Sequence, residues 1–180
     1  MARISLIEEQ DHPELADLIR QIRGARRGRL INVYKLLLHS PALAEAWFAL
    51  NNAVRWHTQL DGRLRELIII RVGVVCDAAY ILRQHIPKLA IAEGVTAAEC
   101  EALRDWRSST AFSERERAAL AYADAVTTRV KCSAEEFAAV RAFLDERQIV
   151  ELTVLIGTYN MHTRVLQALD IPLEPTPAAT

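Results

Sequence analysis

Cysteine, glycine and proline are all scarce in this 180-residue chain, and each scarcity narrows the fold. There are three cysteines, at positions 76, 100 and 132, and no two of them form a CxxC pair. Neither a disulfide framework nor a zinc knuckle is therefore indicated, and the cysteines fit a reducing compartment. Only 6 glycines and 6 prolines interrupt the chain, which leaves room for long helices.

Long apolar runs and an excess of one charge sign are missing as well. No uninterrupted apolar segment approaches the ~20 residues needed to cross a bilayer. Acidic residues also break up the apolar residues near the N-terminus, so the core of a secretory signal is absent there. The formal net charge is -1, which provides no basic field to hold a nucleic-acid backbone. We therefore expect a cytoplasmic protein that binds neither membranes nor nucleic acid.

Hydrophobic residues recur at helical spacing almost throughout, without a convincing alternation of period two. The 51% hydrophobic and 25% charged fractions are typical of a soluble globular protein. We expect an all-α fold, a compact helical bundle formed by one domain over residues 1–180. Residues 1–40 would be an N-terminal helical extension, and residues 171–180 a tail that frays.

Local sequence signals place several helix boundaries. A capping box, in which a hydroxyl residue is followed three positions later by Glu, predicts helix starts at Thr96, Ser113 and Ser133. Gly94 is expected to end the preceding helix in a left-handed conformation. Further helices are expected over residues 13–22, 30–38, 41–55, 63–75, 78–92 and 146–168. The most apolar segments, 67–75 and 149–156, should lie at the centre of the bundle or in a subunit interface.

Glu66 introduces a carboxylate into the most apolar of these helices. It shares a helical face with Ile70 and Gly73, at spacings of four and seven residues. If that face points inward, the carboxylate is buried and needs a donor such as a histidine or an arginine. If it points outward, Glu66 is a surface residue bonded to Arg63 or Arg65. Periodicity alone does not decide between the two.

His85 lies in the next predicted helix, two residues before Pro87. A proline inside a helix removes the hydrogen bond to the carbonyl four residues earlier, here that of Arg83, and bends the axis. This bend and the missing side chain at Gly73 predict a small pocket between the two helices, with Glu66 on one wall and His85 on the other. A lone histidine can equally be a satisfied core residue.

Cys76 is the candidate nucleophile. Nine residues separate it from His85. In a continuous helix turning about 100° per residue the two side chains would be half a turn out of phase. Only a break between Val74 and Asp77, with Asp77 as the N-cap of the next helix, would bring the thiol close to the imidazole. Alternatively, Cys76 is a small hydrophobe without a chemical role.

Three segments together resemble a known family. The stretches RLRELIIIRVG, YILRQHIPKLAIAEG and GTYNMHTRVLQALDIPLE are similar to the carboxymuconolactone decarboxylase-like superfamily, which includes the alkylhydroperoxidase AhpD. The resemblance runs from about residue 42 to residue 174 and is most specific over residues 63–94. It implies a helical bundle of the AhpD-like type.

The resemblance also assigns roles to single positions. In redox members, a Glu on one helix and a CxxC pair followed by a His on the next form a proton relay that activates the thiols. Glu66 and His85 match this pattern, whereas the two thiol positions hold Ala78 and Ile81. Tyr80 and the YNM sequence at 159–161 are similar to the thiol-free, decarboxylase-like branch.

The function that the resemblance implies is a lyase without a cofactor, acting on a small organic acid or lactone. His85 would be the acid and base and Glu66 its orienting partner. Substrate binding is expected from Tyr80, Tyr159, His162, Arg71 and Arg83, and no metal is expected. Two alternatives stay open: a thiol peroxidase using Cys76, and a non-catalytic helical protein.

We also expect a homo-oligomer. The segment 149–156 is apolar around more of its circumference than one small bundle covers. Family members form cyclic trimers or hexamers with the site close to the interface, so the resemblance implies a trimer or a hexamer here.

Overall fold

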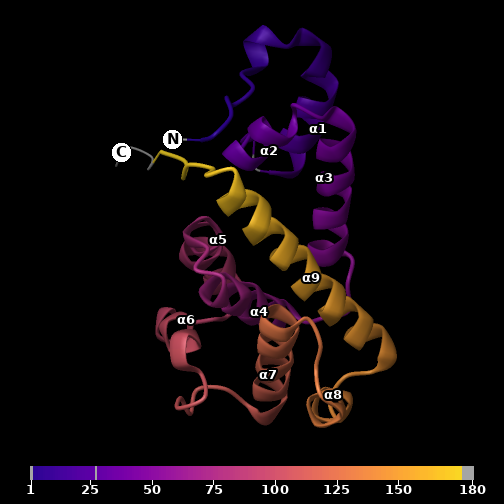
Figure 1. Ribbon diagram of the computed structural model, residues 1–180, viewed down its shortest axis with the longest axis vertical. Helices are drawn as coiled ribbons and strands as arrows, with labels where there is room; N and C mark the ends of the chain where they lie inside the picture. Colours follow the sequence, from indigo (N-terminus) through magenta and orange to yellow (C-terminus); the bar gives the residue numbers. More distant parts are fainter. Residues whose placement is uncertain (1, 27, 176–180) are drawn as a thin grey trace. The chain divides into compact units, whose positions relative to one another are not determined.

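The computed structural model describes residues 2–26 and 28–175 (Figure 1). Every regular element in this part of the chain is helical, which confirms the predicted all-α fold. The described residues divide into two compact units, one drawn from Met1–Ala53 and Leu166–Thr180 and the other from Val54–Val165. All the candidate site residues lie in the second unit.

The first unit begins with two 3-10 turns, Glu9–Asp11 and Pro13–Leu15. It continues with helices α1 (Ala16–Ala25), α2 (Asn32–Leu37) and most of α3 (Pro41–Trp56). The tail predicted over residues 171–180 contacts α2 as far as residue 174. The Asn32 side chain donates to the Pro172 carbonyl at 3.0 Å, and its backbone N–H donates to Glu174 Oε1 at 3.0 Å. Residues 176–180 lie outside the described part of the chain.

The second unit contains helices α4 (Gly62–Val75), α5 (Ala79–His85), α6 (Ala97–Ala102), α7 (Glu114–Arg129), α8 (Ala134–Arg141) and most of α9 (Glu146–Ala168). A π-helical turn, Ile86–Ala90, follows α5, and a 3-10 turn, Leu103–Asp105, follows α6. All three predicted capping boxes are confirmed, at Thr96, Ser113 and Ser133. Gly94 has φ +78°, which confirms its left-handed conformation.

Helix α4 forms the centre of the second unit. The four consecutive residues from Leu67 to Ile70 are all 0% exposed, as expected for the most apolar segment of the chain. Helix α9 instead buries one face and leaves Val150 and Val154 exposed, at 61% and 43%. No helix within the described ranges has both the length and the hydropathy that crossing a membrane requires.

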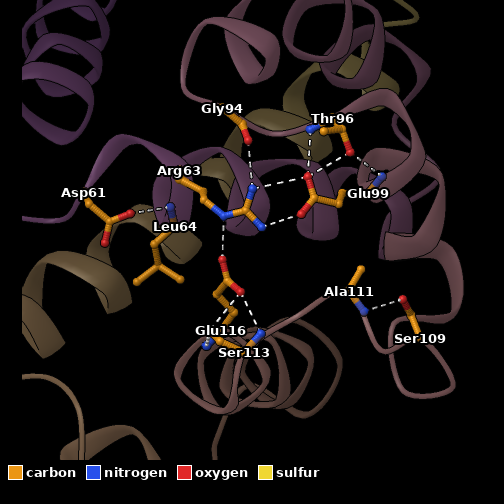
Figure 2. Close-up of polar contacts among 10 residues, drawn as sticks. All are labelled: Asp61, Arg63, Leu64, Gly94, Thr96, Glu99, Ser109, Ala111, Ser113 and Glu116. Carbon is orange, nitrogen blue, oxygen red and sulfur yellow. Dashed lines mark hydrogen bonds and ion pairs between the residues drawn. The ribbon is translucent and has the colours of Figure 1, made fainter.

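Arg63, in the first turn of α4, joins the starts of α6 and α7 (Figure 2). Its guanidinium donates to Glu99 at 2.6 Å and to Glu116 at 2.7 Å, the acidic members of two capping boxes. It also donates to the Gly94 carbonyl at 2.8 Å. The hydrogen bond with Arg63 lowers the pKa of Glu99 to about 2, and the pKa of Glu116 is lowered as well despite its burial. One side chain thus holds three helix ends together.

Replacing Arg63 with Met should lower the free energy of unfolding by about 1–3 kcal/mol at neutral pH, because charge-assisted hydrogen bonds to two half-buried carboxylates are lost. Carboxylates with a lowered pKa stabilise the fold above their ordinary value of 4.5 and stop doing so as the pH falls toward 2. The difference between wild type and Arg63→Met should therefore shrink below pH 4.5.

Urea unfolding across this pH range measures the difference. Arg104→Met is the matched control, since Arg104 pairs with Glu101 on the surface, where the two side chains are 60% and 74% exposed. Equal losses in the two variants, or a difference that does not depend on pH, would contradict the prediction.

Candidate active site

A tight turn joins α4 to α5 at residues 76–78. Asp77 has φ +49°, the Ala78 N–H donates to the Gly73 carbonyl at 2.8 Å, and the Asp77 N–H donates to the Val74 carbonyl at 3.2 Å. These two bonds define a Schellman motif with Asp in the left-handed position that glycine usually fills. The N-cap of α5 is Ala78, so the expectation that Asp77 caps the second helix is wrong.

The Schellman turn sends α5 back along α4. Gly73 is the point of closest approach, because a Cβ atom there would lie 3.0 Å from Leu82 Cδ2 and 3.3 Å from Ile81 Cγ2. Leu82 and Ile81 therefore occupy the space directly beside Gly73. The bend expected at Pro87 takes the form of the π-helical turn Ile86–Ala90 directly after His85, which accommodates a residue without an N–H donor.

Glu66 and His85 meet across this helix pair. His85 Nδ1 lies 2.6 Å from Glu66 Oε2, and the residues are 4% and 1% exposed. The expected approach of the two side chains is thus confirmed, and the surface alternative for Glu66 is excluded. A buried carboxylate accepts the proton of Nδ1, and this fixes the orientation of the ring and leaves Nε2 as the nitrogen that can exchange a proton.

Two aromatic side chains of α9 extend this contact beyond His85. The Tyr159 hydroxyl lies 3.3 Å from His85 Nε2, and the two rings pack edge to face with centroids 5.4 Å apart. His162, one turn further along α9, packs against Tyr159 with ring centroids 5.0 Å apart. Tyr159 and His162 are 2% and 5% exposed. Glu66, His85, Tyr159 and His162 therefore form one buried row, here called the Glu66–His162 row.

The charge of Glu66 has further partners. Arg55, at the end of α3, places Nη2 3.9 Å from Glu66 Oε1, and Arg65 is buried one residue before Glu66. Burial raises the pKa of Glu66, but the contact with His85 and the charges of Arg55 and Arg65 outweigh it. The pKa of Glu66 therefore lies below its ordinary value of 4.5, and the row contains a carboxylate rather than a carboxylic acid.

This geometry can be compared with known proteins. A model of the carboxymuconolactone decarboxylase family matches residues 41–125. The uncharacterized protein YnjA of Escherichia coli (strain K12) is 31% identical over 122 residues, which make up 67% of this chain and 66% of that protein. Residues 41–125 are thus a region of the carboxymuconolactone decarboxylase type.

Solved structures agree with the AhpD-like fold. A protein of unknown function from Agrobacterium tumefaciens, proposed to be the antioxidant defence protein AhpD, is 27% identical with a TM-score of 0.73, covering 78% of this chain and 97% of its own. A peroxidase-related protein with an alkylhydroperoxidase AhpD core, from Ralstonia eutropha JMP134, is 18% identical with a TM-score of 0.81, covering 96% and 92%. At that identity the second likeness shows the fold alone.

The two thiol positions of the redox carboxymuconolactone decarboxylase relatives are apolar here. Ala78 is 2% exposed as the N-cap of α5, and Ile81 is 5% exposed and packs against Gly73. Cys76 lies two residues before the first position, as the C-cap residue of α4, and is partly exposed. No group of three or more His, Cys, Asp and Glu side chains suited to a metal ion occurs among the described residues.

The remaining candidates differ in burial and in bonding. Arg71 is bound elsewhere, because its Nε and Nη2 donate to the two carboxylate oxygens of Asp124 at 2.6 and 3.1 Å. Arg83 is exposed. Tyr80 is buried but five positions before His85, which puts the two on different faces of α5.

Arg55 was not predicted to lie near Glu66. Its position at the end of a helix, followed by Trp56, carries no local signal of burial. The only hint was the requirement that a buried Glu66 be paired with a cation. That requirement does not specify which arginine provides the charge.

Replacing Glu66 with Gln should lower the free energy of unfolding by about 1.5–3 kcal/mol at neutral pH, because a charge-assisted bond to His85 becomes a neutral one. The lowered pKa of Glu66 means that this stabilisation is present above pH 4.5 and is lost as the pH falls below it. Urea unfolding at neutral pH and below pH 4.5 tests both parts.

Glu101→Gln is the matched control, because Glu101 pairs with Arg104 at 3.0 Å and both side chains are exposed, at 74% and 60%. Its loss should stay below about 1 kcal/mol. A Glu66→Gln variant as stable as wild type at neutral pH would show that the buried contact does not stabilise the fold.

Proposed function

We propose that this protein is a lyase without a cofactor that acts on a small lactone or keto acid by acid and base catalysis. The observation that carries the proposal is the buried contact between Glu66 and His85. Glu66 orients the imidazole and balances its positive charge, and His85 transfers the proton through Nε2. The proposal includes that the reaction uses no cysteine thiol.

The reaction class follows from what one oriented imidazole can do. When the bond to a departing carboxylate breaks, CO₂ leaves and the electron pair stays on the neighbouring carbon, where a carbonyl group delocalises it. His85, protonated at both nitrogens, then delivers the Nε2 proton to that carbon. The Glu66 carboxylate stabilises the imidazolium before the transfer and keeps Nδ1 protonated after it.

Tyr159 lies on the reacting side of the imidazole. Its hydroxyl contacts Nε2 at 3.3 Å, a long hydrogen bond that a substrate oxygen can replace or share. His162 packs on the Tyr159 ring and limits its movement. We assign Tyr159 and His162 to the substrate side of the site, and leave out Arg71 because Asp124 already holds it.

A thiol peroxidase is the second candidate, favoured by the peroxidase-related proteins of the same fold. Cys76 would be the reacting thiol, at the partly exposed end of α4. Cys100 does not suit this role, because burial and the nearby charges of Glu99 and Glu66 raise the pKa of its thiol. With Ala78 and Ile81 at the paired thiol positions, an external thiol would have to resolve the oxidised Cys76.

His85→Ala should reduce CO₂ release from an active lactone or keto acid by about 10²- to 10⁴-fold in kcat, because the proton donor is lost. A panel of such acids identifies the substrate, and CO₂ release measures turnover. His57→Ala, at an exposed histidine, and Cys76→Ser should both keep wild-type activity.

Two results would contradict the proposal. One is full activity in His85→Ala. The other is turnover of an alkyl hydroperoxide with a dithiol reductant that Cys76→Ser abolishes, which would establish the peroxidase instead.

We further propose that the protein is a homo-oligomer, a trimer or a hexamer. Val150 and Val154 are one turn apart on α9 and form an apolar strip that this chain does not cover. A second copy is the natural cover for such a strip.

Light scattering coupled to size exclusion should give a mass several times the 20.2 kDa of one chain. Val150→Lys should lower that mass, because it places a charge in the apolar strip. Val130→Lys, at an 84% exposed residue in the turn after α7, should leave it unchanged. A wild-type particle of one chain mass would reject the assembly.

A further inference from the structure

Arg55 is a buried cation with unused hydrogen-bond donors. The residue is 6% exposed, yet neither Nε nor Nη2 has a hydrogen-bond partner among the described residues. Its ion pair with Glu66 does not change this, because 3.9 Å is too long for a hydrogen bond. Buried polar groups in folded proteins nearly always have a partner, so two free donors on one guanidinium need an explanation.

The two free donors lie on the same edge of the guanidinium. Arg71 shows what this edge binds in the same protein, because its Nε and Nη2 hold the two oxygens of the Asp124 carboxylate. The matching pair of atoms in Arg55 is therefore a complete fork for one carboxylate. Trp56 covers a face of the Arg55 guanidinium at 4.7 Å from its ring centroid, which leaves the edge as the place for a ligand.

The charges around Arg55 favour one more anion. With His85 protonated, the row and its neighbours contain the cations Arg55, Arg65 and His85 against the carboxylates of Glu66 and Glu93. One monoanion balances this set. A phosphate dianion would add a second negative charge only a few ångströms from Glu66, so a carboxylate is the better ligand.

We propose that Arg55 binds a carboxylate of the substrate through Nε and Nη2, and so determines the preference of the site for organic acids. The inference rests on the proposed function for its choice of substrate class. A molecule held at this edge lies beside Glu66, whose other oxygen is bonded to His85. Arg55 is thus a binding residue that presents an acid to the reacting imidazole.

The test compares a keto acid with its uncharged analogue. Levulinate and levulinamide are titrated into the full-length protein by calorimetry. Wild type should bind levulinate at least about 10-fold tighter than levulinamide, because only the carboxylate uses the fork. Arg55→Gln and Arg55→Lys should each weaken levulinate binding by about 10- to 100-fold, since lysine keeps the charge but has no fork. Levulinamide binding should not change in either variant.

Arg65→Gln is the matched control. Arg65 is also 6% exposed and also lies over Trp56, at 5.5 Å, but its Nη2 is already bonded to Glu93. Its levulinate affinity should fall clearly less than that of the Arg55 variants, because Arg65→Gln removes one nearby charge but neither donor of the fork. Far-UV circular dichroism shows whether each variant is folded, and if Arg55→Gln does not fold, Arg55→Lys provides the answer.

Three results would overturn the inference: equal affinity of wild type for levulinate and levulinamide, unchanged levulinate affinity in a folded Arg55 variant, or an equal loss in Arg65→Gln. These are distinct from a failure of the proposed function. Arg55-dependent binding without CO₂ release from any acid would leave the carboxylate site standing and reject the lyase. Loss of CO₂ release in His85→Ala, together with levulinate binding that does not depend on Arg55, would support the lyase and reject the carboxylate site.

Discussion

A negative charge inside the most apolar helix of the chain is the constraint on which the rest of this site depends. Glu66 is 1% exposed and is followed in α4 by four residues that are fully buried. A carboxylate in such a place costs several kcal/mol unless hydrogen bonds and opposite charges compensate. His85 supplies the hydrogen bond and Arg55 a nearby charge, and together they keep the pKa of Glu66 below its ordinary value.

The backbone is arranged so that this compensation is available. The Schellman turn at Asp77 reverses the chain between α4 and α5, and Gly73 lets the two helices approach closely enough for His85 to reach Glu66. The π-helical turn that contains Pro87 follows directly after His85. An imidazole held at Nδ1 by a buried carboxylate has one remaining nitrogen, and that restriction is what makes it suitable for directed proton transfer.

Local signals made the helix starts predictable, because a capping box such as Thr96 with Glu99 is complete within four residues. The contact between Glu66 and His85 spans 19 residues and became predictable only through the family resemblance. The contents of the space beside Gly73 could not be read from the sequence, since they depend on which way Ile81 and Leu82 point. The same limit applies to arginines: nothing local distinguishes Arg55, with its free donors, from the other arginines of the chain.

The central claim is that Glu66 accepts a hydrogen bond from Nδ1 of His85 inside the folded protein. Nuclear magnetic resonance of protein labelled with ¹⁵N-histidine tests it most directly. We predict one ring N–H proton that is shifted strongly downfield, exchanges slowly with water and is absent from His85→Ala. It should move far upfield in Glu66→Gln, because the acceptor loses its charge. A wild-type spectrum without such a proton, or one that Glu66→Gln leaves unchanged, would contradict the account.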